Sequence, residues 1–215
     1  MRTNSGGASP EWPDKFHSLG QQAGNSSQTE PPVLIFDTET DGLAGAHAIQ
    51  LAFVIEIAGA EVATFNEYIA LTPGRSINKF AQKIHGISEE VLEEKGKPAR
   101  TVLTEFFKAV DRVLATHGTI VAHNAAFDVA VVNRSAESCD LDRRLALEDV
   151  FCTMKESKAK LGLKNVQGRP KNPKNSELFE ALVGPIPPDA QLHDALADVR
   201  ITCKSYRAAK NAGWW

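Results

Sequence analysis

The sequence predicts an α/β domain in which a mixed sheet of five strands is flanked by helices. Three observations carry this prediction. Residues 33–40 are a short apolar run that ends in polar and turn-forming residues, which is typical of a strand buried on both faces. Residues 49–57 and 61–71 follow as two strands joined by a very short turn, which favours an antiparallel hairpin. From Pro98 onward, apolar residues recur at spacings of three and four, as they do on one face of a helix.

The rest of the chain supplies the remaining strands and helices. Residues 76–95 have the pattern of short helical pieces, and residues 119–122 that of another buried strand. Asn124 is a good N-cap for a helix that follows this strand. Residues 148–153 are expected to form the fifth strand, and a last amphipathic helix runs from Leu192 onward.

Composition indicates an ordinary globular protein. The chain has 215 residues, of which 42% are hydrophobic and 24% charged, enough apolar content for one substantial core. The net charge of -3 carries no global basic signature, so nucleic-acid binding would have to rest on local patches. Three cysteines without a CxxC pair suit a reducing compartment, and neither a signal peptide nor a membrane-spanning run is found. We therefore expect a cytoplasmic protein without a membrane partner.

The pattern along the chain predicts one domain with two appendages. Residues 1–31 are rich in Ser, Gly, Gln, Asn and Pro, a composition typical of a disordered tail. Residues 32–210 carry the predicted strands and helices, and residues 211–215 are assigned to a short C-terminal tail. Trp12 and Phe16 could dock a polymerase or another protein partner, although isolated aromatic residues in such a tail are more often incidental.

Four carboxylates lack a basic partner in their own segments. Asp37 and Glu39 lie two apart at the end of the first strand, so both side chains leave it on the same side. Asp128 lies among apolar neighbours on a helix, where an unpaired charge is costly, and Asp198 lies at the edge of the apolar face of the last helix. The simplest common account is that all four converge on divalent cations. Oxygen ligands without Cys or clustered His favour Mg²⁺ or Mn²⁺ over zinc.

Such a site would suit phosphoryl transfer. Two ions about 4 Å apart can stabilise the attacking and leaving oxygens of a phosphodiester displacement. His193 lies five residues before Asp198 and could take the proton from the attacking water. Each feature also occurs by chance, since about one Asp-x-Glu pair is expected in a chain of this composition, and a His at a helix start is more often a surface residue.

A basic segment lies between two of the acidic motifs. It either forms a solvated surface or contacts the phosphates of a nucleic acid. Its members are Lys155, Lys158, Lys160, Lys164, Arg169, Lys171 and Lys174, against a single Glu156.

Three segments, FDTET, HNAAFD and HDALAD, resemble the three exonuclease motifs of the DEDD superfamily, in the subgroup whose fifth motif residue is His. This family includes the proofreading subunit of bacterial replicative polymerases and several trimming ribonucleases. The resemblance covers about residues 32–208 and implies a ribonuclease H-like fold. It also implies that two Mg²⁺ or Mn²⁺ ions support release of nucleoside 5′-monophosphates from nucleic-acid 3′ ends. DNA proofreading or trimming is favoured over RNA, with a single-stranded end as the partner.

The resemblance further implies a role for each motif residue. The four motif carboxylates would hold the two ions, and His193 would be the general base. His85, from the matching IHGIS segment, would lie near the terminal nucleotide. Thr40 and Leu43 would support or wedge the terminal base, and Asn124 would approach the sugar-phosphate.

Two other functional classes stay open at this point, beside an exoribonuclease or oligoribonuclease of the same family. The first is a hydrolase of the same metal type that acts on a small nucleotide, which the IHGIS match disfavours because that segment indicates an oligonucleotide end. The second is a non-catalytic module that recruits a polymerase or binds nucleic acid. It is disfavoured because a pure binding module does not need four uncompensated acids in one place.

Overall fold

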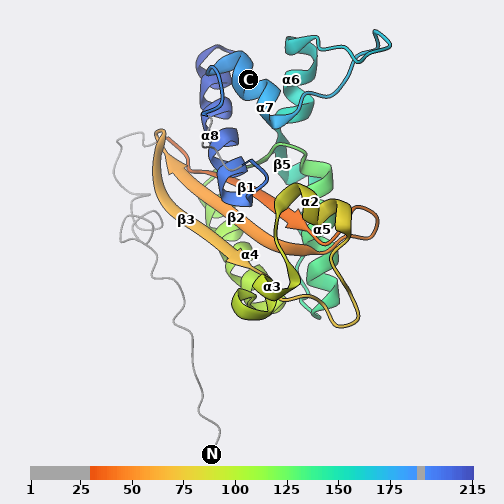
Figure 1. Ribbon diagram of the computed structural model, residues 1–215. Coiled ribbons are helices and arrows are strands. Elements are labelled where there is room, and N and C mark those ends of the chain that lie inside the picture. The colour runs from red at the N-terminus through yellow and green to blue at the C-terminus, as the bar shows by residue number, and fades with distance from the viewer. Residues whose placement is uncertain (1–29, 188–191) are drawn as a thin grey trace, which may run out of the picture.

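The computed structural model describes residues 30–187 and 192–215, which form a mixed five-stranded sheet with helices on both faces (Figure 1). The strand order is β3-β2-β1-β4-β5, and β1 pairs antiparallel with β2 and parallel with β4. This confirms the predicted mixed five-stranded sheet. The strands are β1 (Val33–Thr40), β2 (Ala48–Ile57), β3 (Ala60–Tyr68), β4 (Thr119–Ala122) and β5 (Val150–Cys152).

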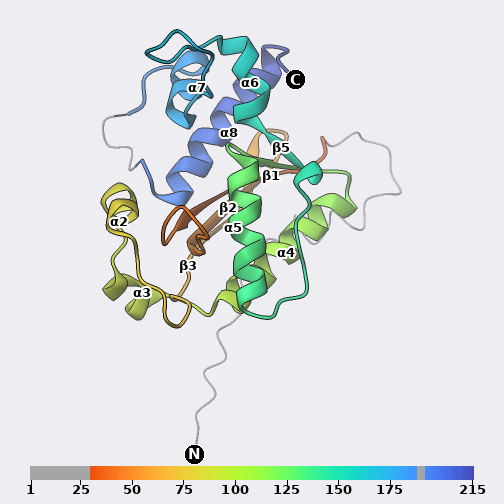
Figure 2. The ribbon, with the colours of Figure 1, turned by 90° about the vertical axis from the view of Figure 1, so that its right-hand side faces the viewer.

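The helices divide between the two faces of the sheet. α4 and α5 cover one face and α8 covers the other, as Figures 1 and 2 show together. α6 and α7 lie at one end of the molecule, where α7 packs along α8. The bounds are α2 (Lys79–His85), α3 (Glu89–Lys95), α4 (Ala99–Ala115), α5 (Ala125–Ser138), the short 3-10 turn η2 (Leu147–Asp149), α6 (Thr153–Leu161), α7 (Asn175–Leu182) and α8 (Ala195–Asn211).

The larger core lies between the sheet and the α4/α5 layer. Phe36 and Phe53 of the sheet contact Phe106 of α4, with ring centroids 5.1 Å and 6.2 Å apart. Leu34 and Phe36 of β1 belong to this core, whereas Ile35 belongs to the core under α8. Because successive side chains of a strand point to opposite faces, the residues that follow on β1 inherit this alternation. Asp37 and Glu39 therefore face the α8 layer.

The end of β1 projects beyond its parallel neighbour. The pairing of β1 with β4 ends with Ile35 opposite Val121, and β4 itself ends at Ala122. α5 begins at Ala125, only a short turn later. The carboxyl end of β1 therefore lies beside the start of a helix instead of a strand, which allows side chains from both helical layers to meet there.

Several boundaries differ from the prediction. β3 ends at Tyr68 and not at residue 71. The Ile69 N–H still donates to the Ile49 carbonyl of β2, but Ile69 also forms a bridge with Lys97, and Ala70 hydrogen-bonds to Lys97. The basic segment, for which no helix was predicted, contains α6. This helix buries only Thr153 and Ser157, so the apolar periodicity that would indicate a helix is missing.

The last residues of the chain pack on the domain. The ring of Trp215 lies 5.2 Å from that of Phe151 and 5.9 Å from that of Tyr206, centroid to centroid. Residues 211–215, which the sequence analysis set apart as a tail, are thus held against the α8 side of the sheet by aromatic contacts. Residues 1–29, with Trp12 and Phe16, lie outside the described residues. None of the helices in the described ranges combines the length and apolarity that crossing a bilayer requires.

Candidate active site

Three of the four predicted carboxylates converge at the end of β1. Asp37, Glu39 and Asp198 each offer a carboxylate oxygen, and these oxygens all lie within 4.8 Å of one another. β1 supplies the first two, and the first turn of α8 supplies the third. They meet because α8 covers the sheet face toward which Asp37 and Glu39 point.

The fourth carboxylate approaches from the other helical layer. Asp128 lies in the first turn of α5 and is only 3% exposed. Its Oδ1 accepts a hydrogen bond from the Thr38 hydroxyl at 2.8 Å. Thr38 points to the α5 side of β1, between the two acids that point to the α8 side. Asp128 is thus beside the cluster and acts electrostatically on Asp37, but it is not among the three carboxylates that come within 4.8 Å.

The acids make one another harder to ionise. Burial and then the charge of Asp128 raise the pKa of Asp37 well above its ordinary value. Burial and then repulsion from Asp198 raise the pKa of Glu39 to about 8. Burial raises the pKa of Asp128 to about 7, against the opposing hydrogen bond from Thr38. Burial also raises the pKa of Asp198.

No Lys or Arg within the described ranges forms an ion pair with any of these four acids. Clustered, partly buried carboxylates without an internal counter-charge are hard oxygen ligands of the kind that Mg²⁺ and Mn²⁺ prefer. The residues therefore fit a divalent metal centre.

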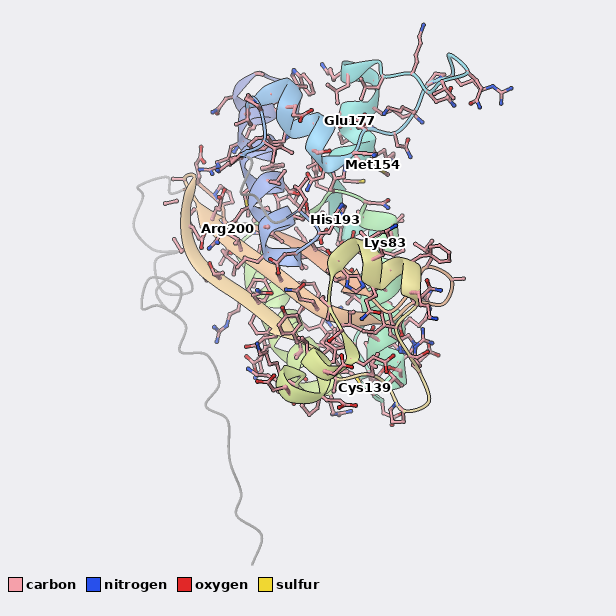
Figure 3. All side chains as sticks on the ribbon, in the orientation of Figure 1. Lys83, Cys139, Met154, Glu177, His193 and Arg200 are labelled. Atoms are coloured by element: carbon pink, nitrogen blue, oxygen red, sulfur yellow. The ribbon has the colours of Figure 1, made fainter. Side chains whose placement is uncertain are left out.

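His193 lies at the mouth of this cluster. It is exposed, and its backbone has a positive φ of 67°, which a non-glycine residue adopts rarely. Its N–H donates to Oδ2 of Asp198 at 3.0 Å, so the turn that enters α8 joins the two residues. The ring also acts electrostatically on His85 of α2. Figure 3 labels His193 at the entry to α8, and Figure 2 shows α2 next to this entry.

The start of α8 is fixed by residues that the sequence analysis missed. Asp194 caps the helix by accepting from the Ala197 N–H at 3.1 Å, and it also accepts from the Gln50 side chain at 2.8 Å. Gln50 belongs to β2 and is 1% exposed. An Asp immediately before an apolar helical pattern is an N-cap signal that could have identified Asp194. No local signal identifies Gln50, because its partner lies far away in sequence.

A cavity of about 690 Å³ opens beside the acids. Glu39 lines it together with three residues predicted to contact substrate, Thr40, Leu43 and His85. Asn124, the fourth predicted substrate contact, is exposed at the N-cap position of α5, and its side chain makes no capping bond there. It is not among the lining residues. The full lining is Thr38, Glu39, Thr40, Asp41, Gly42, Leu43, Ala44, Arg75, Asn78, Phe80, Ala81, Ile84, His85 and Phe127.

The loop that carries Leu43 is tied down at its base. Asp41 is 3% exposed and accepts from Nη2 of Arg75 at 2.9 Å, while a second contact joins its other carboxylate oxygen to Nε of Arg75. The same carboxylate accepts from the His47 N–H at 2.9 Å. The carbonyl of Asp41 accepts from the Asn78 N–H at 2.8 Å, which links the loop to the N-cap of α2. Sequence reasoning missed this pair because 34 residues separate Asp41 from Arg75.

His85 combines a satisfied and an unsatisfied nitrogen. Its Nδ1 accepts from the Ile87 N–H at 3.0 Å, which leaves Nε2 as the protonated nitrogen of a neutral ring. Nε2 is buried and makes no hydrogen bond of ordinary geometry among the described residues. Burial lowers the pKa of His85, although the Thr40 backbone is near enough to oppose this lowering. The ring therefore presents a donor that a bound ligand would satisfy.

Fold and site together define a class of protein, a hydrolase whose clustered acids stand at the strand end of a mixed sheet beside a substrate-sized cavity. The comparisons with known proteins agree. The family model described as exonuclease matches residues 34–206. The PolC-type DNA polymerase III of Streptococcus pneumoniae is 32% identical over 117 residues, which is 54% of this chain and 8% of that polymerase.

Solved structures show the same fold. Exonuclease X in complex with 5′-overhanging duplex DNA has 26% identity and a TM-score of 0.59, over 85% of this chain and 94% of the other. Escherichia coli exonuclease I in complex with a dA16 oligonucleotide has 19% identity and a TM-score of 0.63, over 85% of this chain and 41% of the other.

This chain belongs to the exonuclease family and has the mixed five-stranded sheet of the ribonuclease H-like fold. The family depends on divalent metal ions, in agreement with the acidic cluster.

Proposed function

We propose that the chain removes nucleoside 5′-monophosphates one at a time from DNA 3′ ends, with two Mg²⁺ or Mn²⁺ ions. Asp37, Glu39, Asp128 and Asp198 would hold the ions. When bound, the ions would stabilise charge on the attacking and leaving oxygens of the phosphodiester. The observation that carries the proposal is the set of three carboxylates within 4.8 Å, unpaired with any Lys or Arg of the described residues, of which Glu39 also lines the cavity.

The chain's own residues would orient the reactants. His193 would take the proton from the attacking water, since it is exposed at the mouth of the cluster and its backbone is bonded to Asp198. Thr38 would hold the Asp128 carboxylate in place through its hydrogen bond. Water attack at the last phosphodiester leaves the phosphate on the released nucleotide, so the product is a nucleoside 5′-monophosphate.

The cavity would hold the terminal nucleotide. His85 would donate its unsatisfied Nε2–H to this nucleotide, and Thr40 and Leu43 would support its base. Asn124 would approach the sugar-phosphate from the start of α5. DNA is favoured over RNA because exonuclease X and exonuclease I are both seen with DNA in their structures. A single-stranded end is favoured because the dA16 oligonucleotide seen with exonuclease I carries only adenines and cannot form Watson–Crick pairs with itself.

The protein context is also part of the proposal. A cytoplasmic location and a polymerase partner are supported by the likeness to part of a PolC-type polymerase. The N-terminal segment with Trp12 and Phe16 would be the contact to that partner.

The decisive experiment uses oligonucleotides labelled at the 5′ end, as single- and double-stranded DNA and RNA, with Mg²⁺, Mn²⁺ or a chelator. The expected result is a ladder that shortens from the 3′ end of single-stranded DNA and releases 5′-mononucleotides, only with metal. A circular single strand should stay intact. Cleavage of the circle would contradict the exonuclease proposal, and faster decay of RNA would move the substrate to RNA.

His193 is tested separately from the acids. His193→Ala should lower turnover roughly 10²- to 10⁴-fold while metal and substrate binding are retained, because a general base contributes to the transition state and not to ligation. Asp198→Ala should lose both turnover and metal binding. Near wild-type turnover in the His193 variant would overturn its role as base, and lost metal binding would make it a ligand instead.

A further inference from the structure

The outer rim of the cavity carries a cluster of exposed apolar side chains. Three of its lining residues are large, hydrophobic and exposed: Leu43 is 84% exposed, Phe80 80% and Ile84 59%. By contrast, the phenylalanines of the core, such as Phe36 and Phe106, are at most 1% exposed. Single exposed apolar residues are ordinary, but three that gather on one cavity beside an acidic cluster indicate a binding surface.

Phe80 and His85 lie near opposite ends of α2, and both line the cavity. His85, at the end of α2, is close enough to His193 for their charges to interact. Phe80 lies five residues earlier on the same helix, which corresponds to about 7.5 Å along its axis at 1.5 Å per residue. Consecutive phosphates of one strand are spaced about 3.4 Å along a duplex axis, so this separation spans more than one nucleotide. Since both residues line the same cavity, a strand whose last nucleotide lies at His85 can place an inner nucleotide beside Phe80.

The charges around Phe80 suit a nucleic-acid strand. Lys79 and Lys83 flank it on α2, and both are exposed. Neither is part of an ion pair within the part of the chain that the structure describes. An aromatic face with cations beside it is the combination that binds stacked bases and their phosphates. Figure 3 labels Lys83 on α2, on the same side of the molecule as His193.

The backbone of Phe80 is held by the N-cap of α2. The Asn78 side chain caps α2 by accepting from the Phe80 N–H at 2.9 Å. The Asn78 N–H donates to the carbonyl of Asp41, at the base of the loop that carries Leu43. A preformed surface lowers the entropy that binding must overcome. Phe80 and Leu43 thus line one cavity and belong to backbone segments that are hydrogen-bonded to each other.

We propose that Phe80, assisted by Lys79 and Lys83, stacks on a nucleobase on the 5′ side of the terminal nucleotide. This inference rests on the proposed function and deepens it. The substrate is then a 3′ end with at least two unpaired nucleotides, because an inner base must leave the base stack of a duplex before its face can contact Phe80. Recognition of the inner base is independent of its identity, since every base has a π-face.

The test is a cycle of protein and substrate changes. Binding of a single-stranded oligonucleotide is measured in an Asp37→Asn background, which prevents cleavage. Phe80→Ala is expected to weaken binding about 5- to 100-fold, as base–aromatic stacking supports, and Phe80→Trp to preserve it. Leu147→Ala, which removes another exposed apolar side chain away from the cavity, is the matched control and should bind normally.

The oligonucleotide is then given one abasic site at each position from the 3′ end in turn. The loss caused by Phe80→Ala should disappear when the second or third base is missing and should remain when only the terminal base is missing. Undiminished binding by Phe80→Ala, or a loss that depends on the terminal base alone, would overturn the inference.

A single-nucleotide substrate separates this inference from the proposed function. Thymidine 5′-monophosphate p-nitrophenyl ester has no inner base, so the wild-type protein should hydrolyse it through the acidic cluster alone. Hydrolysis of the ester together with no coupling in the abasic cycle would remove the inference and leave the proposed function standing. A wild-type protein that attacks neither the ester nor a 3′ end would overturn both.

Discussion

Two acidic sites lie within five residues of each other at the end of β1, and the protein treats them differently. The Asp41 side chain is 1% exposed and is paired with Arg75, whose side chain is 32% exposed. Asp37 and Glu39 face Asp198 instead, and their pKa values are raised by burial and by the neighbouring acids. Asp41 therefore has its counter-charge within the folded chain.

The difference shows which acid serves the fold and which serves chemistry. A buried carboxylate that only supports structure is stable when the chain supplies its cation, as Arg75 does for Asp41. Carboxylates held together without a cation repel one another and destabilise the metal-free fold. A bound external ion would offset this repulsion. The comparison therefore supports the proposal that Asp37 and Glu39 bind metal, and it identifies Asp41 as an anchor of its loop.

The largest expected effect contrasts the two sites directly. Asp37→Asn should lower exonuclease turnover by roughly 10³-fold or more, because a metal ligand is lost, and should raise the melting temperature of the metal-free protein, because repulsion is relieved. Asp41→Asn should do the opposite, lowering the melting temperature and keeping turnover within about tenfold where the protein is folded. Turnover on an oligonucleotide and thermal melts in chelator measure both. Equal effects of the two changes would break the comparison.

The next effect is on stability against pH. Since the pKa values of Glu39 and Asp128 are raised to about 8 and about 7, the folded metal-free protein binds more protons than the unfolded chain between pH 4 and 8. Its free energy of unfolding should therefore fall as pH rises through this range. Mg²⁺ or Mn²⁺ at about 100 times the dissociation constant should restore about 2.7 kcal/mol, or roughly 5 to 10 °C in melting temperature. If millimolar metal leaves the melting temperature at pH 8 unchanged, the acidic cluster does not bind metal.

The same comparison separates what the sequence could predict from what it could not. Asp37 and Glu39 could be placed on one side of a strand because the period of two fixes their direction. Asp198 could be placed because the apolar face of its helix defines which way it points. Both inferences use only neighbours within a few residues.

The missed contacts are those between distant segments. Asp128 can accept a hydrogen bond from Thr38 because β1 extends beyond the end of β4 and α5 begins beside that extension. This arrangement depends on the register between the two strands, which neighbouring residues in the sequence do not determine. The Asp41 pair depends on a loop closing onto Arg75. Phe80 was missed for a different reason. A large apolar residue in a helix is expected to be buried, and only the fold shows that Phe80 is exposed.

A smaller effect tests Asp41 from its partner's side. Arg75→Met should destabilise the protein by about 1–3 kcal/mol, less than for a fully buried pair because water reaches the Arg75 side chain. The double variant with Asp41→Asn should recover part of this loss, because no unpaired carboxylate is left buried. Urea unfolding of the single and double variants gives the coupling energy. Strict additivity would mean that the two side chains do not depend on each other.

The smallest expected effect is on nucleic-acid binding by the basic segment, whose charge is opposite to that of the two acidic sites. Its end lies near the acids, because the side chain of Asn175, next to Lys174, donates to the carbonyl of Asp198 at 3.1 Å. Lys171 is already paired with Glu177, so it has less charge to offer a phosphate than its neighbours. Lys164 and Arg169 lie farther along the connection between α6 and α7.

Replacing Lys164, Arg169 and Lys174 together by Gln should weaken binding of all single-stranded sequences alike and reduce the slope of log affinity against log salt. Each lost phosphate contact removes about 0.7 from that slope for a single strand, so the largest change is about 2. Lys171→Gln is the matched control and should change the slope least, because its charge is neutralised by Glu177 in the free protein. A slope that stays the same in the triple variant would assign the segment to the solvated surface. A change in the Lys171 variant as large as in the triple variant would mean that the ion pair opens when the strand binds.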